Sequence, residues 1–413
     1  MLQDLVNQIG EVLAPFEAHF ERYGYATYDS SDIYETALGR RAKRAWEKDS
    51  KTAFLYAAPL VILDILFPQS RRLFAEMKVQ PICLAQVGLA YLRLAEVRQD
   101  SGDRYLALAR RCFSDLKYCA RATRSGIGWG LNINWSTKSG YMPPLTPCHS
   151  QTAYVFELIA CLNRIAPSEE LLGYLERIVN HTAFDYIEFE EPTVRSRVTG
   201  YSVMDTRAVL NAQSYRLVIL LSGYTLFRCP DYLDRALDGL EYLIRWQQKD
   251  GSWPYSPEER FVDGYHTCFI LKNLFETSNL LRTTGDLGDR ATDLTARLAP
   301  SIDLGYRYFL DRLLDGVNRP IPFAVSNKPV LYRYDAYDLA EALNLVSLFG
   351  DVRRVAALIK FFRTTMRLPS GLGRYRYYPG VSPILPGISY HRYANSAFFL
   401  AAANALHRVS IRP

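Results

Sequence analysis

Apolar residues recur at positions i, i+3, i+4 and i+7 along nearly every long segment of the chain, a spacing that is typical of α-helices. Two kinds of helix alternate. One kind, such as "HSQTAYVFELIACLNRI" at 149–165, is apolar on all sides after a polar start, and the other, such as "DYLDRALDGLEYLIRWQQ" at 231–248, carries charges along one face. A helix that is apolar all round must be buried, whereas an amphipathic helix lies at the surface. The alternation therefore predicts an inner ring of helices wrapped by an outer ring.

The inner-type helices form a repeat along the whole sequence. Their polar starts recur about every 50–70 residues, as in a helical-hairpin repeat, and lie at 80, 146, 211, 263, 334 and 391. The last inner-type helix reaches the end of the sequence without an outer partner, and helices within residues 1–50 would close or flank the ring. We therefore predict an all-α fold, an (α/α)6-type toroid of helical hairpins, as a single domain over residues 1–413.

The longest and most aromatic loops lead into the inner helices. Examples are "GIGWGLNINWSTKSGYMPPLTP" at 126–147 and "GLGRYRYYPGVSPILPGISYHRY" at 371–393. In a toroid these loops converge on one face, where the polar helix starts would line a central pocket. Loops on a rigid scaffold commonly carry function, and small-ligand sites are concave and lined by aromatic and a few polar groups. The pattern therefore predicts a site at this face.

Composition and charge narrow the classes of protein. The chain has 413 residues, of which 49% are hydrophobic and 22% charged, an ordinary globular composition without a linker or low-complexity tract. The net charge is +6, but the basic residues are scattered. Their densest cluster, at 39–48, is interpreted as a solvated helix face, with an anionic-substrate or membrane-surface patch as the alternative. No nucleic-acid-binding module is recognisable.

Cysteine usage and hydropathy bear on the compartment. The seven cysteines are odd in number and include no C-x-x-C, which favours reduced, buried thiols. The N-terminal segment is amphipathic and acidic, unlike a signal peptide. The strongest apolar stretch, at 53–67, contains Pro59 and Asp64 and is shorter than the roughly 20 apolar residues of a membrane helix. We therefore expect a soluble cytoplasmic protein without a transmembrane segment, for which peripheral membrane association stays open.

Four stretches together carry a family resemblance. They are "QPICLAQVGLAYL", "GWGLNINW…TPCHSQTAYVFEL", "DGSWPYS…DGYHTCFILKNL" and "YPG…YHRYANSAFFLAAANAL". In this order they resemble a family of (α/α)-toroid proteins encoded in bacterial capsule and O-antigen gene clusters, over roughly residues 50–407. The resemblance implies a six-hairpin toroid, a role in surface polysaccharide synthesis and an oligo- or polysaccharide substrate that could be lipid-linked.

Two more distant families share parts of the pattern. The repeat of loops and small-residue helices is similar to the helical domain of glucuronyl 5-epimerases, and the "DGSW" turn is similar to prenyltransferases and squalene cyclases. "YHTC" resembles a prenyltransferase stretch whose histidine binds zinc, which would correspond to His266. The paired Asp/Cys motif of that zinc site is missing, however, and "VMDTRA" offers only Asp205 where cyclases have D-x-D-D. No metal and no cofactor are therefore predicted.

Candidate catalytic residues stand at the inner helix starts. His266 is the strongest, because histidine can act as acid or base near neutral pH. Asp263, one turn earlier, could orient that ring or simply cap the helix. His149 holds the equivalent place two hairpins earlier, where capping is an equal alternative. The predicted catalytic set is completed, at the start of the last inner helix, by Tyr390 and His391.

Candidate substrate-binding residues come from the same loops and starts. Aromatic faces can stack on sugar rings, and the planar fork of arginine can hold a carboxylate or phosphate. Asp335 and Asp338 lie one helical turn apart, and we interpret one as a cap and the other as a hydroxyl-binding group. A purely structural role is the alternative for each residue. The predicted binding set comprises Trp129, Trp135, Asn211, Trp253, Tyr265, Asp335, Arg374, Arg376 and Arg392.

These residue types favour one reaction among several. A histidine or tyrosine base, a second acid and an arginine that neutralises a carboxylate suit proton abstraction next to that carboxylate, as in uronate 5-epimerisation or β-elimination. Glycoside hydrolysis is the nearer alternative and needs two opposed carboxylates. A non-catalytic glycan-binding or assembly component and a prenyl transferase or cyclase are further alternatives. The sequence therefore predicts a carbohydrate-active protein of bacterial surface polysaccharide synthesis.

Overall fold

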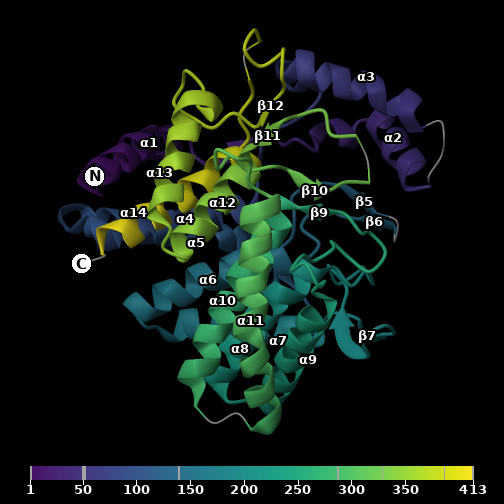
Figure 1. Ribbon diagram of the computed structural model, residues 1–413, viewed down its shortest axis with the longest axis vertical. Coiled ribbons are helices and arrows are strands. Elements are labelled where there is room, and N and C mark those ends of the chain that lie inside the picture. The colour runs from purple at the N-terminus through teal and green to yellow at the C-terminus, as the bar shows by residue number, and fades with distance from the viewer. Residues whose placement is uncertain are drawn as a thin grey trace.

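The computed structural model describes residues 2–48, 53–137, 140–285, 288–327, 329–385 and 387–411. Its inner helices are α4 (Pro81–Val97), α6 (His149–Ile165), α8 (Leu210–Phe227), α10 (Gly264–Thr284), α12 (Ala336–Leu348) and α14 (Ser396–Ser410). Each of them contacts the next, and α14 contacts α4, so the ring closes (Figure 1). The predicted all-α toroid is confirmed.

The outer helices cover the ring from outside. After each of the first five inner helices the chain returns through α5 (Gly102–Cys119), α7 (Glu169–Phe184), α9 (Pro230–Trp246), α11 (Asp289–Arg312) or α13 (Val352–Phe361). The N-terminal helix α1 (Leu2–Tyr23) packs on α14 and α13 and so takes the outer position beside the last inner helix. The N-terminal segment thereby supplies the outer partner that α14 lacks in its own part of the sequence.

Burial follows the two sequence patterns. In the inner helix α8 the buried residues occupy every side, whereas the outer helix α9 buries Leu237 and Leu240 and exposes Asp231 and Asp234. Close approach between the layers depends on small residues. A Cβ at Gly223 of α8 would lie 2.4 Å from Cγ1 of Val179 in α7. The side chain of Val179 in α7 therefore packs directly against the backbone of α8 at Gly223.

Short antiparallel strand pairs tie down the loops at the helix starts. They are β1 (Ala26–Thr27) with β2 (Lys78–Val79), β3 (Arg121–Ala122) with β4 (Ile127–Gly128), β5 (Trp135–Thr137) with β6 (Gly140–Met142), β7 (Glu188–Glu191) with β8 (Ser196–Thr199), β9 (Val262–Asp263) with β10 (Phe323–Val325), and β11 (Tyr334–Asp335) with β12 (Arg376–Tyr377). The last two pairs matter most, because they bring loop segments beside the starts of α10 and α12. Asp335 lies opposite Arg376 in the β11–β12 register.

A further helical pair lies outside the ring. The basic cluster at 39–48 falls largely in α2 (Ala37–Glu47), which packs on α3 (Ala53–Leu66), and both lie at one edge of the molecule (Figure 1). Short turns complete the chain: η1 (Asp32–Glu35), η2 (Pro68–Leu73), η3 (Gln99–Ser101), η4 (Phe362–Met366) and η5 (His391–Asn395). Within the described ranges, no helix combines the length and apolar character needed to cross a bilayer. All seven cysteines are free thiols.

Candidate active site

A histidine–aspartate pair lies at the start of α10. Asp263 caps the helix by accepting a hydrogen bond from the backbone N–H of His266, at 3.2 Å. The same carboxylate accepts a second bond from Nδ1 of the His266 ring, at 2.7 Å to Oδ2. Because the carboxylate holds the Nδ1–H group in a hydrogen bond, Nε2 is the ring nitrogen that is left to accept a proton. The Asp263 side chain is 1% exposed and the His266 side chain 18%, so only the imidazole reaches solvent.

Aromatic rings surround this imidazole. The Tyr265 and Tyr255 ring centroids lie 4.2 and 4.8 Å from that of His266. Tyr265 in turn packs on Tyr337 of α12, and Tyr337 packs on Tyr393, which precedes α14. The half-buried rings of Tyr265 and Tyr393 thereby join the starts of three successive inner helices. This arrangement offers the flat apolar faces on which sugar rings stack.

A buried carboxyl group lies behind the histidine pair. Asp338, in the first turn of α12, accepts a hydrogen bond from the backbone N–H of Tyr265 at 3.0 Å. Burial raises the pKa of Asp338 well above its usual range, and the neighbouring carboxylates of Asp335 and Asp263 raise it further. The protonated form of the Asp338 carboxyl is therefore favoured over the charged form relative to an exposed aspartate. A buried acid of this kind beside a histidine is typical of catalytic sites.

Gly264 allows the close approach of Asp338. A Cβ at this position would lie 2.5 Å from Oδ1 of Asp338 and 3.3 Å from the backbone oxygen of Ile321. Gly264→Ala should therefore push Asp338 off the Tyr265 amide and lower the free energy of unfolding by about 1–3 kcal/mol, measured by urea denaturation. Gly173→Ala is the control, because a Cβ there meets nothing within 4 Å. An unchanged stability of the Gly264 variant would contradict the close contact.

Arg376 lies at the edge of the same cluster. Its Nε donates to Oδ2 of Asp335 at 2.8 Å, and Asp335 also caps α12 by accepting from the backbone N–H of Tyr337 at 2.9 Å. The guanidinium carbon lies 4.0 Å from the ring centroid of Tyr332 and 4.6 Å from that of Tyr375. The side chain stays 28% exposed. Arg376 is thus held in place by a carboxylate and two rings while part of it reaches solvent.

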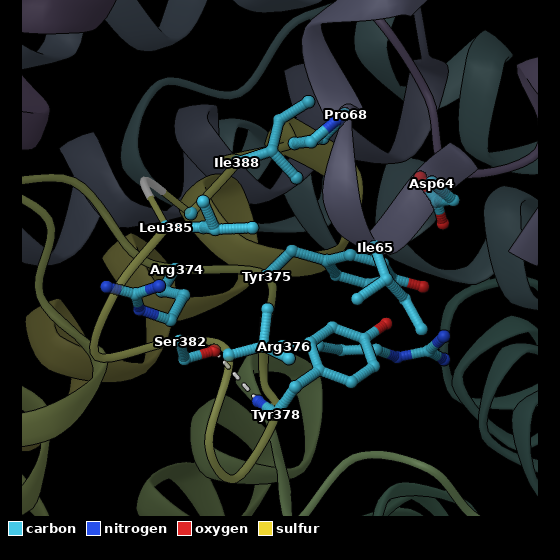
Figure 2. Close-up of a pocket in the computed structure, with 12 residues that line it drawn as sticks. Asp64, Ile65, Pro68, Arg374, Tyr375, Arg376, Tyr378, Ser382, Leu385 and Ile388 are labelled. Atoms are coloured by element: carbon cyan, nitrogen blue, oxygen red, sulfur yellow. Dashed lines mark hydrogen bonds between the residues drawn. The ribbon is translucent and has the colours of Figure 1, made fainter. Parts of the chain in front are cut away.

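Arg374 faces elsewhere. A cavity of about 30 Å³ lies between the α3–η2 segment and the loop before α14, and both arginines line it. In Figure 2 the two guanidinium groups point in opposite directions. Nε of Arg374 is buried without a hydrogen-bond partner, and burial lowers the pKa of its guanidinium. The two arginines therefore do not form one clamp.

The other predicted catalytic residues are packed in the interior. His149 stacks on Tyr186 with ring centroids 3.8 Å apart, and its Nε2 is 3.0 Å from Oγ1 of Thr199. Burial holds the pKa of His149 well below its usual range, and the charge of Arg216 lowers it further. This fully buried ring points to the β8 segment and not to the α10–α12 cluster. We assign it a structural role.

The two predicted residues before α14 lie toward the N-terminal segments. The His391 ring meets that of His19 from α1 edge-on at 5.1 Å, and burial lowers the pKa of His391 to about 3. Tyr390 is completely buried, with the Arg71 guanidinium 4.9 Å from its ring centroid. Sequence position suggested a pocket-facing start, but the first turn here is π-helical and directs these side chains against α1 and η2.

Two predicted sugar platforms are core residues. Trp129 is 0% exposed and Trp253 2%, and each indole N–H donates to a backbone oxygen at 2.9 Å, of Leu116 and Leu243 respectively. No face of either ring is open to a sugar. Trp135, in contrast, is half-buried in β5, with Nζ of Lys43 4.2 Å from a ring centroid, outside the α10–α12 cluster.

Two further binding candidates, Arg392 and Asn211, are buried. The fork of Arg392 is occupied, because Nε and Nη2 each donate to the buried Asp29 carboxylate at 2.6 Å. Arg392 thus anchors the N-terminal segment instead of a ligand. Asn211 is buried in the first turn of α8, and its Oδ1 has no hydrogen-bond partner.

The structure adds Tyr332, which the sequence did not single out and which packs on Arg376. It also gives Asp338, considered from the sequence only as a cap or a hydroxyl-binding group, the character of a buried carboxyl with a raised pKa. Deeper in the ring, Lys272 of α10 pairs with the fully buried Glu341 of α12, which also accepts from Tyr154 at 3.4 Å. The sequence contains a signal for the Lys272–Glu341 pair, because both are charged residues inside inner helices that are otherwise apolar. A buried charge requires a partner.

The same fold occurs in carbohydrate enzymes of known structure. A sugar epimerase from a ruminal bacterium matches with a TM-score of 0.56 at 11% identity, over 81% of this chain and 89% of that protein. Cellobiose 2-epimerase from Bacillus thermoamylovorans matches with a TM-score of 0.54 at 12% identity, over 79% and 87%. A family 76 glycoside hydrolase (mannosidase) from Bacteroides thetaiotaomicron matches with a TM-score of 0.56 at 10% identity, over 98% of each chain.

These likenesses establish the (α/α) toroid. At 10–12% identity they do not carry over a reaction or a substrate. No protein-family model and no curated protein sequence matches the chain.

Proposed function

We propose that the protein is a carbohydrate-active enzyme that abstracts a proton from a sugar carbon next to a carboxylate or carbonyl group, as epimerases and lyases do. The observation that carries the proposal is the Asp263–His266 pair, in which the carboxylate binds Nδ1 and leaves Nε2 as the base. The imidazole is partly exposed among tyrosine rings, as contact with a sugar requires.

Three neighbouring groups fit the remaining needs of this chemistry. Arg376 is partly exposed and would pair with the negative charge that develops on the substrate's carboxylate or carbonyl oxygen. Burial keeps the pKa of the Tyr265 phenol well above its ordinary value, so it stays a hydrogen-bond donor. Asp338 supplies a buried carboxyl with a raised pKa, which accepts a hydrogen bond from the Tyr265 amide. The base, the donors and the arginine come from α10, α12 and the β11–β12 pair.

The substrate that we propose is a uronate-containing glycan of bacterial surface polysaccharide synthesis, free or lipid-linked, handled in the cytoplasm. The sequence resemblance to capsule and O-antigen proteins supports this assignment. The epimerases and the mannosidase of the same fold support a glycan more generally. A uronate also matches the arginine at the site, since its carboxylate is the planar partner that a guanidinium binds best.

The test is proton exchange at the sugar. The purified chain is incubated in D₂O with uronate-containing polysaccharides and, in parallel, with reducing disaccharides, and deuterium is followed by NMR. Exchange at carbon 5 of a uronate supports 5-epimerisation or elimination, and a new double bond seen by ultraviolet absorbance separates elimination. Exchange at carbon 2 of a reducing sugar reassigns the reaction to 2-epimerisation. Absence of exchange on both panels would refute proton abstraction from these classes.

Glycoside hydrolysis is the second candidate, and one observation favours it. Burial and the nearby charges of Asp335 and Asp263 raise the pKa of the Asp338 carboxyl. The general acid of a glycoside hydrolase is a carboxyl group with a raised pKa. Hydrolysis releases reducing ends without deuterium entering the sugar carbons. Assaying reducing ends in the same D₂O incubations therefore separates the two candidates.

A further inference from the structure

The segment 53–77, which contains α3 and η2, exposes many large apolar side chains. Nine of the twenty-five exposed large hydrophobic side chains in the described part of the chain lie within residues 54–77. Among them are Phe54 (71% exposed), Leu55 (70%), Ile62 (55%) and Leu73 (88%). Contiguous exposed apolar surface of this kind marks an interaction site.

The exposure is not a sign that α3 is loosely placed. Its other face is anchored: Leu60 is buried with Ile33 and Ala42, and Ala57 and Leu63 pack against them. On the outer face, positions 55, 59, 62 and 66 are all exposed, and this i, i+4, i+7, i+11 spacing puts them on one stripe of the helix. One face of α3 therefore holds the helix to the protein while the opposite face presents apolar groups to solvent.

Basic residues flank the apolar stripe. Arg40, Arg41 and Arg44 of α2 are exposed, and so is Arg72 beside Leu73. Within described residues 53–77 the acidic groups are Asp64, which pairs with Arg71, and the exposed Glu76. Because α2 packs on α3 at the edge of the molecule (Figure 1), apolar and positive groups share one surface.

We propose that this surface, formed by α2 and residues 53–77, docks the protein onto an anionic lipid bilayer. The α3 helix has 14 residues, about 21 Å of length, which is shorter than the ~30 Å hydrocarbon core. It would therefore lie in the plane of the membrane, with its apolar stripe among the acyl chains and the arginines at the headgroups.

The positive charge of this surface favours an anionic bilayer as its partner over a second copy of the chain. A symmetric dimer through the α3 stripe would bring two like-charged α2 helices to the rim of one interface, which opposes association. An anionic bilayer instead satisfies both features of the surface at once. The docking does not rest on the proposed reaction, because the exposed side chains that carry it lie outside the α10–α12 cluster.

The test is co-sedimentation of the full chain with lipid vesicles. We expect binding to phosphatidylcholine vesicles that contain roughly one-third phosphatidylglycerol, and at least about tenfold weaker binding to phosphatidylcholine alone or at high salt. Leu55→Ser/Ile62→Ser/Leu73→Ser should abolish binding, and Arg41→Gln/Arg44→Gln should weaken it severalfold. The matched control Tyr118→Ser/Ile187→Ser/Ile384→Ser replaces three exposed apolar residues elsewhere and should bind like the wild type.

Several outcomes would overturn the proposal. Wild-type protein that stays in the supernatant with the anionic vesicles refutes it, and so does equal loss of binding in the control triple variant. A concentration-dependent dimer in light scattering that only the α3 triple variant dissociates would assign the surface to a second copy. Thermal unfolding by circular dichroism checks that each variant is folded, which the exposure of the replaced side chains favours.

Discussion

Replacing His266 by alanine is expected to slow deuterium incorporation into the substrate by about 10²–10⁴-fold. The reason is that the variant loses the nitrogen that accepts the proton, whereas Asp263 keeps its place as the cap of α10. The side chain is partly exposed, so its removal leaves no closed cavity. The rate is measured by NMR on the substrate that the wild type exchanges.

Two variants sharpen this prediction. His407→Ala removes another partly exposed histidine that pairs with a carboxylate, Glu96, and should leave the exchange rate unchanged. Asp263→Asn keeps an oxygen for the helix cap but removes the negative charge beside the ring, so we expect a fall in kcat with an unchanged KM. Exchange at the wild-type rate in the His266 variant would exclude it as the base.

The effect of Asp338→Asn on the free energy of unfolding is expected to depend on pH. Compared with the wild type, the variant should be relatively more stable at pH 7 than at pH 4. The folded-state pKa of Asp338 is raised, so above pH ~4 the unfolded chain releases this proton while the folded chain keeps it. Wild-type stability therefore declines with rising pH by at most about 1.4 kcal/mol per pH unit until the folded-state pKa is reached. Asparagine keeps an oxygen for the Tyr265 amide and removes this decline.

Urea unfolding at several pH values between 4 and 7 measures the effect. The difference in free energy of unfolding between Asp338→Asn and wild type should grow as the pH rises. Asp293→Asn, whose wild-type side chain is 68% exposed, is the control and should show a constant difference. A constant difference for Asp338→Asn as well would mean that its carboxyl ionises normally.

The same variant distinguishes the two candidate reactions. An amide cannot donate the proton that a departing glycosidic oxygen needs, so Asp338→Asn would abolish hydrolysis even though its stability relative to wild type improves as the pH rises. If proton abstraction by His266 is the reaction, Asp338→Asn should retain more deuterium exchange than His266→Ala. Loss of activity in a variant that removes the pH-dependent loss of stability is expected for a buried carboxyl kept for function.

The fold was largely predictable from local patterns. The polar starts in the sequence match the helices α4, α6, α8, α10, α12 and α14 because a helix without a polar face has no stable place except the interior. The contact of α1 with α14, however, joins the two ends of the chain. Which helix fills the last outer position depends on this long-range packing, which hydrophobic periodicity alone leaves undecided.

The candidate site was predictable in its types of residue but not in its membership. Asp263 and His266 are one helical turn apart, so their pairing follows from helix geometry. His149 and His391 stand at similar starts, yet one stacks on Tyr186 and the other meets His19. The direction of a side chain at a helix start depends on the neighbouring loop, and the sequence contains no local signal for it.

The sequence by itself determined the helices, their alternation, the polar starts and the local Asp263–His266 pair, because all of these depend on residues within a few turns. Only the tertiary structure decided which polar groups meet. In the folded chain Asp338 accepts a hydrogen bond from the Tyr265 amide, and the guanidinium of Arg392 binds the Asp29 carboxylate. The side chains of Arg374 and Arg376 point in opposite directions. The physical reason is that hydrogen bonds and burial act over a few ångströms in space, across any distance along the chain.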